Sequence, residues 1–327
     1  MIKTAALREA YDRLPREGES VRYAIGTMQS IDDAYTQRTI EDRTRVEKQL
    51  ADGFTRVGLD VTFDYQGSVT NDTHIRAHSD LDLLTVETRF EVIERPNKPQ
   101  NPYAGDSIAN LREIRNNTVD ILQSAFPEAE VDDSGSKAVS ISGGSLRRKV
   151  DLISSAWWHT VDYVREPEKH WLGIQVLDNE KGAKVPNKPF LHNKLLDDRD
   201  TAVNGGLRKL IRLLKSVKYD NDPVLNISSY DIAAIVYNMP DDWLFSRPGQ
   251  DLGLVRHCKS YLHFLLMTPQ SRSSIRVPNN MRTVFGGDGA NEADLAALSA
   301  AFAALVAEIE RELESTRRSI TEAKVFY

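Results

Sequence analysis

The sequence contains a single cysteine, Cys258, and no long hydrophobic run among its 327 residues. One cysteine excludes an internal disulfide, and it excludes zinc fingers and ribbons, which need several closely spaced ligands. No stretch approaches the roughly 18 apolar residues that span a bilayer, and charges occupy the N-terminus where a signal peptide is apolar. We therefore expect a cytoplasmic protein without a membrane partner.

A surplus of basic charge is also missing. The chain has 42 Lys and Arg against 48 Asp and Glu, which gives a net charge of -6. Proteins that grip duplex nucleic acid usually carry the opposite balance, so we expect no large nucleic-acid template. Local clusters of basic residues at 147–149 and 208–218 could still bind nucleotides. The content of 40% hydrophobic and 28% charged residues is typical of a folded protein with one large or two packed domains.

The first half of the chain mixes helical and strand patterns. Helices are expected over 30–52, where Ser30 and Asp33 form a capping-box pattern, and over 107–125, which Pro127 ends. The expected strands are short apolar or alternating segments: 59–66, 80–87, 138–142 and 146–154. Gly143-Gly144 between the last two is a hairpin signal.

The second half is predicted to be almost entirely helical. Its apolar residues recur at helical spacing in four segments: 205–219, 228–239, 251–267 and 292–318. The order predicts an α+β fold, with a catalytic lobe at 1–165 that includes the long first helix. A helical lobe at 166–327 is expected to close the active-site cleft.

Two carboxylates in the segment Ser79-Asp80-Leu81-Asp82 carry the chemical signal. Alternation along a strand points Asp80 and Asp82 to one face, where their repulsion needs a cation to offset it. Asp151, in a second apolar strand pattern, is the candidate third ligand. Oxygen ligands alone favour Mg²⁺ or Mn²⁺, and three carboxylates can hold two such ions for phosphoryl chemistry. The alternative is a solvated strand edge or a capping role.

The dipeptide Gly67-Ser68 upstream of these carboxylates favours the functional alternative. Glycine allows the backbone to approach a phosphate closely, and the amide and hydroxyl of Ser68 can donate hydrogen bonds to its oxygens. The ordered set of Gly-Ser, Asp-x-Asp and a later strand Asp is more specific than any member alone.

The segments GSVTNDTHIRAHSDLDLLTV and VDLI resemble the signature of polymerase-β-like nucleotidyltransferases. More narrowly, they are similar to bacterial cyclic-oligonucleotide synthases of antiphage signalling, relatives of cyclic GMP-AMP synthase. The helix GGLRKLIRLLKSVK and the following ISSYDIAAIVY also match these enzymes. The resemblance implies a polymerase-β-like nucleotidyltransferase core with a mixed β-sheet, packed against a C-terminal helical lobe.

The resemblance also implies roles for individual residues. Asp80 and Asp82 would bind both metal ions, and Asp151 would bind the catalytic ion and help deprotonate the attacking hydroxyl. Gly67 and Ser68 would hold the β- and γ-phosphates of the nucleoside triphosphate. The product would be a cyclic di- or trinucleotide second messenger, made from NTPs with release of pyrophosphate and read by an effector protein. Transfer of one nucleotide to a protein, RNA end or small molecule is the alternative, and a catalytically silent binding protein is a third.

Four further residues are candidates for nucleotide binding. The basic side of the 205–219 helix, with Lys215, is expected to face either solvent or the cleft, where it could meet the triphosphate. Ser229 and Tyr230 begin the next helix, where a hydroxyl could reach phosphate and a ring could stack on a base; the alternative is an ordinary N-cap with a packing aromatic. Gln66 could touch a phosphate or base, or simply end its strand.

Aromatic and imidazole side chains near the motif have less specific interpretations. Trp157-Trp158, just after Asp151, could line a pocket for the acceptor base, but core packing explains at least one ring equally well. His74 and His78 are interpreted as loop residues rather than ligands.

Overall fold

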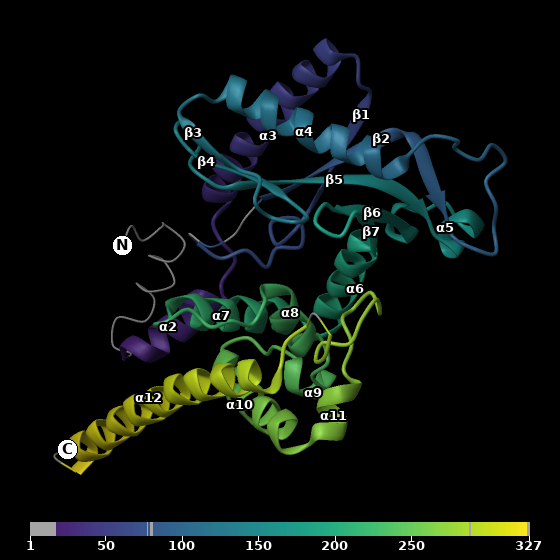
Figure 1. The fold of residues 1–327 in the computed structure, drawn as a ribbon. Coiled ribbons are helices and arrows are strands. Elements are labelled where there is room, and N and C mark those ends of the chain that lie inside the picture. Colours follow the sequence, from purple (N-terminus) through teal and green to yellow (C-terminus); the bar gives the residue numbers. More distant parts are fainter. Residues whose placement is uncertain (1–17, 77, 79–80, 288, 326–327) are drawn as a thin grey trace. The chain divides into compact units, whose positions relative to one another are not determined.

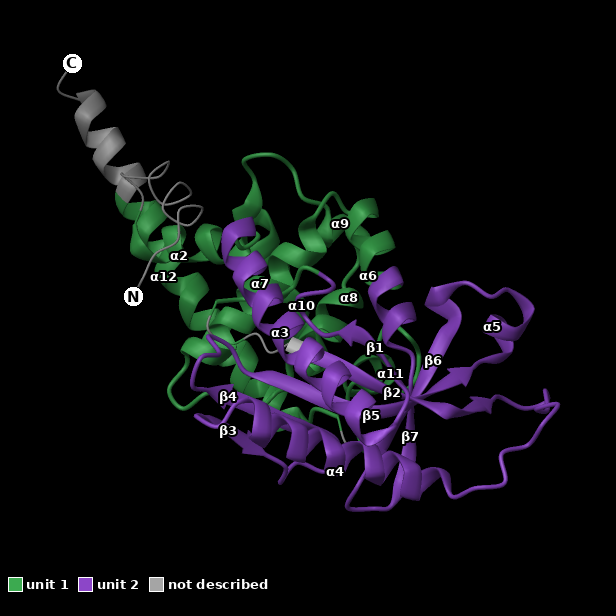
Figure 2. Ribbon diagram, turned by 90° about the horizontal axis from the view of Figure 1, so that it is seen from above, with its two compact units in different colours: residues 1–32, 72–78, 195–327 green, residues 33–71, 79–194 purple. Residues whose placement is uncertain are grey.

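The chain divides into two compact units, each described here by itself (Figure 2). The computed structural model describes residues 18–76, 78, 81–287 and 289–325. The sheet unit comprises residues 33–71 and 79–194. The helical unit comprises residues 1–32, 72–78 and 195–327.

The sheet unit is built on a seven-stranded mixed sheet (Figure 1). Its strands are β1 (Val61–Gln66), β2 (Leu81–Ile93), β3 (Ala129–Asp132), β4 (Val139–Gly143), β5 (Val150–His159), β6 (Leu172–Asp178) and β7 (Ala183–Asn187). They run in the order β1-β2-β5-β4-β3, while β6 pairs with the C-terminal half of β5 and with β7. The β2–β5 pair is parallel, and the other pairs are antiparallel.

Two long helices, α3 (Asp33–Val57) and α4 (Ser107–Ala125), bury the residues of one sheet face. Leu50 and Ile114 from these helices share a core cluster with Leu83 of β2 and Leu152 of β5. Side chains alternate along a strand, so Asp82 and Asp151 project from the opposite face. That face is covered further along by Leu84, Val86, Ile153, Ile174, Val176 and Phe190.

Local chemistry sets the ends of these helices. Asp106 caps α4 by accepting hydrogen bonds from the backbone N–H groups of Ile108 and Ala109, and the helix spans the predicted 107–125. The first long helix differs from the expected 30–52, because it begins at Asp33 and runs to Val57. Gly58 follows with a φ of +72°, a conformation that ends helices.

The helical unit has α7 (Gly206–Asp220) at its centre. Besides the end of α6 (Pro189–Ala202), it contains α2 (Glu19–Met28), α8 (Ser229–Tyr237), α9 (Asp241–Leu244), α10 (Asp251–Met267), α11 (Pro269–Ser274) and α12 (Glu292–Val325). Both Leu210 and Leu214 are completely buried within the shared core. An amphipathic apolar stripe therefore predicted α7 correctly, and the predicted helices at 228–239 and 251–267 correspond to α8 and α10.

The boundary between units lies at 194/195 rather than at the expected 165/166. Strand β6 pairs with β5 and β7 pairs with β6, which keeps residues 172–187 in the sheet unit. The short helix α5 (Val161–Arg165), the 3-10 turn at Lys169–Trp171 and the start of α6 (Pro189–Ala202) lie there too. Conversely, α2 packs on α7 in the helical unit. No helix in the described part of the chain is long and apolar enough to cross a membrane.

Candidate active site

Asp82 and Asp151 lie side by side on neighbouring strands. The parallel register of β2 and β5 pairs Asp82 with Asp151, and Leu83 with Leu152. Paired residues on adjacent strands project to the same face, about 5 Å apart along the hydrogen-bonding direction. The two leucines are buried on the helical side, so both carboxylates point to the other side. The remaining predicted ligand, Asp80, lies outside the described residues.

Two neighbours orient the Asp151 carboxylate. Ser140 of β4 pairs with Asp151, and its hydroxyl donates a hydrogen bond of 2.5 Å to Oδ1. The Lys149 ammonium lies 3.0 Å from the same oxygen. The sequence did not identify either residue as a partner of Asp151. Ser140 is recognised only from the register of β4 against β5. Together they hold the carboxylate in one orientation.

Gly67 sits where a side chain would collide with Asp82. The glycine has a φ of +94°, and an added Cβ would lie 2.6 Å from Asp82 Oδ2. Both facts require glycine, since other residues rarely adopt this backbone conformation. The residue before it, Gln66, pairs with Asp82 across β1 and β2. Its Oε1 is buried and accepts no hydrogen bond from the described residues, which leaves an unused acceptor beside the carboxylate.

Ser68 opens a turn that follows β1 and is tied down by side chains. The Thr70 hydroxyl donates to the carbonyl of Gly67 at 2.7 Å. Asn193, on α6, donates to Thr70 Oγ1 at 3.3 Å and accepts from Asn71 Nδ2 at 3.4 Å. Gly67 and Ser68 are therefore held at the end of β1, next to the carboxylate pair.

The donor set fits hard divalent cations. Asp82 and Asp151 supply carboxylate oxygens, and Gln66 Oε1 is an orphaned oxygen acceptor next to them. Mg²⁺ and Mn²⁺ prefer such oxygen ligands. Among the residues that the structure describes, no three His, Cys, Asp or Glu side chains form a metal cluster.

Lys215 was expected to face either solvent or the cleft. The structure shows that it does not face solvent. The side chain is only 2% exposed, and its ammonium donates a 2.7 Å hydrogen bond to the backbone carbonyl of Thr73. Arg212 and Lys218 on the same helix are also buried. The amphipathic pattern identified the buried leucine stripe of α7. It could not show that the basic side of the same helix is buried as well.

Ser229 and Tyr230 lie at the start of α8 in the helical unit. Ser228 is the N-cap, since its hydroxyl accepts from the Asp231 backbone N–H at 2.9 Å. The Ser229 hydroxyl lies 3.5 Å from the Tyr219 hydroxyl. The Tyr230 ring packs against the helical core below the Arg282 guanidinium, and burial raises the pKa of its phenol to about 12. The structure thus shows the N-cap and the packing aromatic that the sequence left as an alternative.

The tryptophan pair divides between two environments. Trp158 is buried, with the Lys188 ammonium 5.0 Å from its ring centroid. Trp157 projects to the other face, where its ring lies 6.2 Å from that of Phe190. His74 is buried, and His78 stacks on Tyr219.

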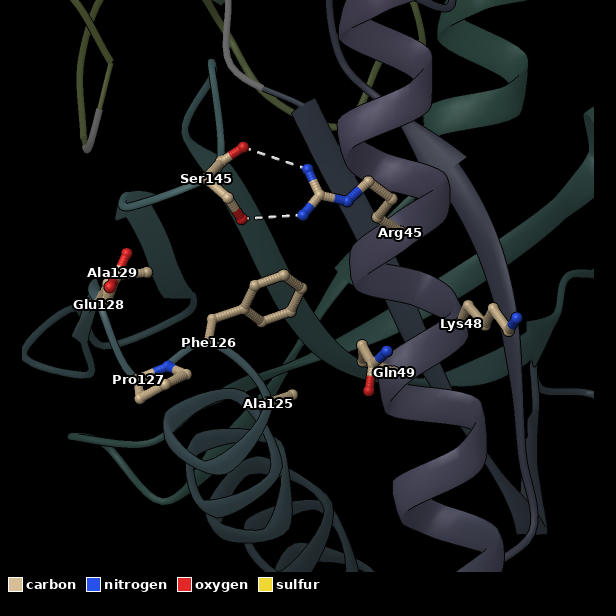
Figure 3. A pocket seen from close by; sticks show the side chains of 9 residues that line it. All are labelled: Arg45, Lys48, Gln49, Ala125, Phe126, Pro127, Glu128, Ala129 and Ser145. Carbon is tan, nitrogen blue, oxygen red and sulfur yellow. Dashed lines mark hydrogen bonds between the residues drawn. The ribbon is translucent and has the colours of Figure 1, made fainter.

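A separate hollow of about 440 Å³ lies elsewhere on the sheet unit (Figure 3). It is lined by Arg45, Lys48, Gln49, Ala125, Phe126, Pro127, Glu128, Ala129 and Ser145. The Arg45 guanidinium is already occupied by hydrogen bonds to the Ser145 carbonyl and hydroxyl, at 3.1 and 2.8 Å. None of the predicted site residues that the structure describes borders this hollow.

Comparison with known proteins identifies relatives along nearly the whole chain. The cyclic dinucleotide synthase CdnE of Yersinia aleksiciae is 32% identical over 311 residues, which cover 94% of this chain and 81% of the relative. A c-di-GMP synthase of a Lachnospiraceae bacterium is 31% identical over 245 residues, covering 67% of this chain and 69% of that protein. A sequence model of the cGAS/DncV-like nucleotidyltransferase C-terminal helical domain matches residues 194–309.

The fold also matches a solved structure. The STING-associated CdnE c-di-GMP synthase from Capnocytophaga granulosa superposes with a TM-score of 0.73 at 24% identity, covering 93% of this chain and 92% of that one. The likeness confirms the predicted mixed-sheet core with a C-terminal helical domain. With the identity to CdnE, it confirms the family that the Gly-Ser and Asp-x-Asp motifs indicated: the chain belongs to the cGAS/DncV-like nucleotidyltransferases.

Proposed function

We propose that this enzyme joins two or three NTPs into a cyclic oligonucleotide, a second messenger of antiphage defence. The observation that carries the proposal is the pairing of Asp82 with Asp151, next to the Gly67 turn, whose positive φ and lack of a Cβ allow the close approach to Asp82. Supporting it, the relatives at 31–32% identity are cyclic dinucleotide and c-di-GMP synthases. GTP is therefore the first substrate to test, and an effector protein that reads the product is the proposed partner.

The chemistry is two or more successive nucleotidyl transfers. In each, a ribose hydroxyl oxygen bonds to the α-phosphorus of a triphosphate, and the bond from that phosphorus to the bridging oxygen breaks. Pyrophosphate leaves with the electron pair, and the last transfer closes the ring within one linear intermediate. Two triphosphates thus yield one cyclic dinucleotide and two pyrophosphates.

Each motif residue has a proposed role in this reaction. Asp80, Asp82 and Asp151 would hold two Mg²⁺ or Mn²⁺ ions, which when bound offset charge on the attacking and leaving oxygens. Asp151, held by Ser140 and Lys149, also receives the proton of the attacking hydroxyl. The backbone at Gly67 and the Ser68 hydroxyl donate hydrogen bonds to the β- and γ-phosphates.

The product is the direct test of the proposed function. Purified protein is incubated with labelled NTPs, singly and in pairs, with Mg²⁺ or Mn²⁺, and the products are treated with phosphatase. We expect labelled nucleotide that resists phosphatase, because a ring has no terminal phosphate. Label that stays attached to a protein, RNA or small molecule would instead establish single-nucleotide transfer.

Two substitutions test the assigned carboxylates. Asp82→Asn and Asp151→Asn keep the side-chain shape but remove a charged metal ligand, so turnover should fall by more than about 100-fold. Asp64→Asn is the matched control: Asp64 lies on β1, and its carboxylate forms an ion pair of 2.7 Å with Lys169. We expect it to retain most of the activity. If the Asp82→Asn or the Asp151→Asn variant turned over at the wild-type rate, the mechanism would be refuted.

A further inference from the structure

A single row of polar side chains crosses five strands of the sheet. The pairings along it are Gln66 with Asp82, Asp82 with Asp151, Asp151 with Ser140, and Ser140 with Asp132. Paired residues project to the same face, so the row lies on the side away from α3 and α4. All five residues belong to the sheet unit. The row therefore places charged and hydrogen-bonding groups on both sides of Asp151.

Both oxygens of the Asp151 carboxylate are engaged. The Lys149 ammonium lies 3.0 Å from Oδ1 and 3.3 Å from Oδ2, so it lies across the two atoms. Oδ1 also accepts the hydrogen bond from the Ser140 hydroxyl. The same oxygens are the atoms through which Asp151 would bind a divalent ion. The ammonium and such an ion therefore need the same partner atoms.

The backbone that carries Lys149 is fixed to α3 by the turn that precedes it. The side chain of Asp42 is completely buried and accepts hydrogen bonds from the Arg147 backbone N–H at 2.8 Å and guanidinium at 3.0 Å. Leu146 is buried in the core cluster under the sheet. Because this backbone is held in place, the ammonium stays at a high effective concentration beside Asp151.

The side chain of Lys149, in contrast, can move. It is 44% exposed, and exposed ion pairs of this kind contribute little to stability. A second carboxylate, Asp132, projects from the same face two strands from Asp151. Hydrogen bonds from the hydroxyl and backbone N–H of Ser134 lower the pKa of Asp132, and the positive charge of Lys149 lowers it further. Displacing the ammonium from Asp151 thus costs little, whereas Ser140 stays on its paired strand.

We propose that the Lys149 ammonium competes with a divalent ion for the Asp151 carboxylate, and so keeps metal binding weak until a nucleoside triphosphate binds with the metal. The inference rests on the proposed metal-dependent transfer and adds a form of regulation to it. Asp82 and Asp151 carry two negative charges, and Lys149 offsets one of them, which weakens their attraction for a divalent ion. The phosphates of a nucleotide supply further oxygen ligands for that ion. We therefore expect metal and nucleotide to bind cooperatively.

The test measures Mn²⁺ binding by electron paramagnetic resonance, without nucleotide. The salt concentration is about 0.15 M, where exposed charges more than about 8 Å apart are largely screened. Lys149→Met removes the ammonium, and we expect it to bind Mn²⁺ at least about threefold more tightly than the wild type. Lys149→Arg keeps the charge and should bind Mn²⁺ no more tightly than the wild type. Unchanged or weaker binding by Lys149→Met would overturn the inference; Lys149→Gln takes its place if Lys149→Met does not fold.

Ser140→Ala separates competition from orientation of the same carboxylate. The Ser140 hydroxyl holds Oδ1 without bringing a charge. Loss of a group that orients a metal ligand weakens metal binding, so we expect the affinity for Mn²⁺ to fall at least about threefold. This change is opposite in direction to that of Lys149→Met. If both substitutions weakened Mn²⁺ binding, Lys149 would only orient Asp151, and the competition would be refuted.

Lys169→Met is the matched control on the same face of the sheet. The Lys169 ammonium lies 2.9 Å from Asp64 Oδ1 and 2.7 Å from Oδ2, so it lies across a carboxylate in the same way. Asp64 is not a proposed metal ligand, and we expect the affinity for Mn²⁺ to change by less than about twofold. Equal tightening by Lys169→Met and Lys149→Met would show a general effect of charge and would overturn the inference.

The cooperativity provides a second measurement. Mn²⁺ binding is repeated with a triphosphate analogue that has a methylene bridge between the α and β phosphorus atoms, after correction for Mn²⁺ held by the free analogue. The analogue should tighten Mn²⁺ binding to the wild type at least about tenfold. In Lys149→Met this gain should be at least about threefold smaller, because the metal already binds well alone. An equal gain in both proteins would contradict the inference.

Failure of the inference is distinguishable from failure of the proposed function. Neither Mn²⁺ measurement requires product. Tighter Mn²⁺ binding by Lys149→Met would support the competition even if the wild type made no cyclic nucleotide, a result that would refute the function. Cyclic product from the wild type, together with equal Mn²⁺ affinities of the wild type and Lys149→Met, would refute the inference alone.

Discussion

At the scale of single residues, Gly67 combines two constraints that are separable by experiment. Its φ of +94° strains any other residue, and a Cβ would lie 2.6 Å from Asp82 Oδ2. We predict that Gly67→Ala costs about 1–3 kcal/mol of stability from backbone strain and displaces the Asp82 carboxylate, so that turnover falls at least about tenfold. Denaturant unfolding and steady-state kinetics measure the two effects.

Gly58→Ala separates strain from collision. Gly58 also has a positive φ, +72°, but an added Cβ there meets nothing within 4 Å. We expect a stability loss of about 1 kcal/mol with normal turnover. If Gly67→Ala retained wild-type turnover despite a similar loss of stability, the close approach of Gly67 to Asp82 would have no role in catalysis.

At the scale of elements, α12 caps α2 through one carboxylate. Glu312 accepts hydrogen bonds from the backbone N–H groups of Ser20 and Val21, at 2.9 and 3.0 Å. These are N–H groups that a helix start leaves without intrahelical partners. The end of α2 in turn accepts the hydrogen bond from Arg212. This cap therefore supports a helix that packs on α7 in the core of the helical unit.

We predict that Glu312→Ala lowers the free energy of unfolding by about 1 kcal/mol at pH 7. Burial acts to raise the pKa of Glu312, but the backbone hydrogen bonds outweigh it and lower the pKa from its ordinary 4.5. A lowered folded-state pKa contributes stability above the unfolded-state pKa, and this is lost as pH falls through the folded value. The difference from wild type should therefore shrink below about pH 4.5.

Urea unfolding of both proteins between pH 7 and pH 3.5 measures this difference. Glu314→Ala, at an exposed position two residues further along α12, is the control and should change stability by less than about 0.5 kcal/mol. A Glu312→Ala effect that stayed constant across the pH range would contradict a role for the ionised carboxylate.

At the scale of the whole molecule, the hydrophobic clusters contain neither Asp82 nor Asp151, the two described ligands of the proposed metal site. The cores consist of apolar side chains, with Leu83 and Leu152 on one side of the sheet and the carboxylates on the other. We predict that chelation by EDTA abolishes turnover while the melting temperature changes by less than about 2 °C, a shift worth roughly 1 kcal/mol. Added Mg²⁺ or Mn²⁺ should restore activity.

Calorimetry and product formation on the same samples check this expectation. Continued turnover after chelation would contradict metal-dependent transfer. Unfolding on chelation would instead assign the ions a structural role.

Patterns within short segments determined much of this protein from sequence. Helical spacing predicted α4 and α7, alternation predicted β1, and the Gly67-Ser68 and Asp80-Leu81-Asp82 motifs indicated the family. These features depend on neighbours a few residues apart, so they can be recognised without a fold. Strands β6 and β7 were not predicted from sequence, because they have weak local patterns and are defined by the pairing of β6 with β5 and of β7 with β6.

Only the tertiary structure decided which distant residues meet. The register of β2 against β5 sets Asp82 beside Asp151, and that of β4 against β5 brings Ser140 to the same carboxylate. The burial of Lys215 likewise depends on a segment far away in the chain, whose Thr73 carbonyl accepts its hydrogen bond. Register and burial arise from the packing of segments that are remote in sequence, and no local pattern encodes that packing.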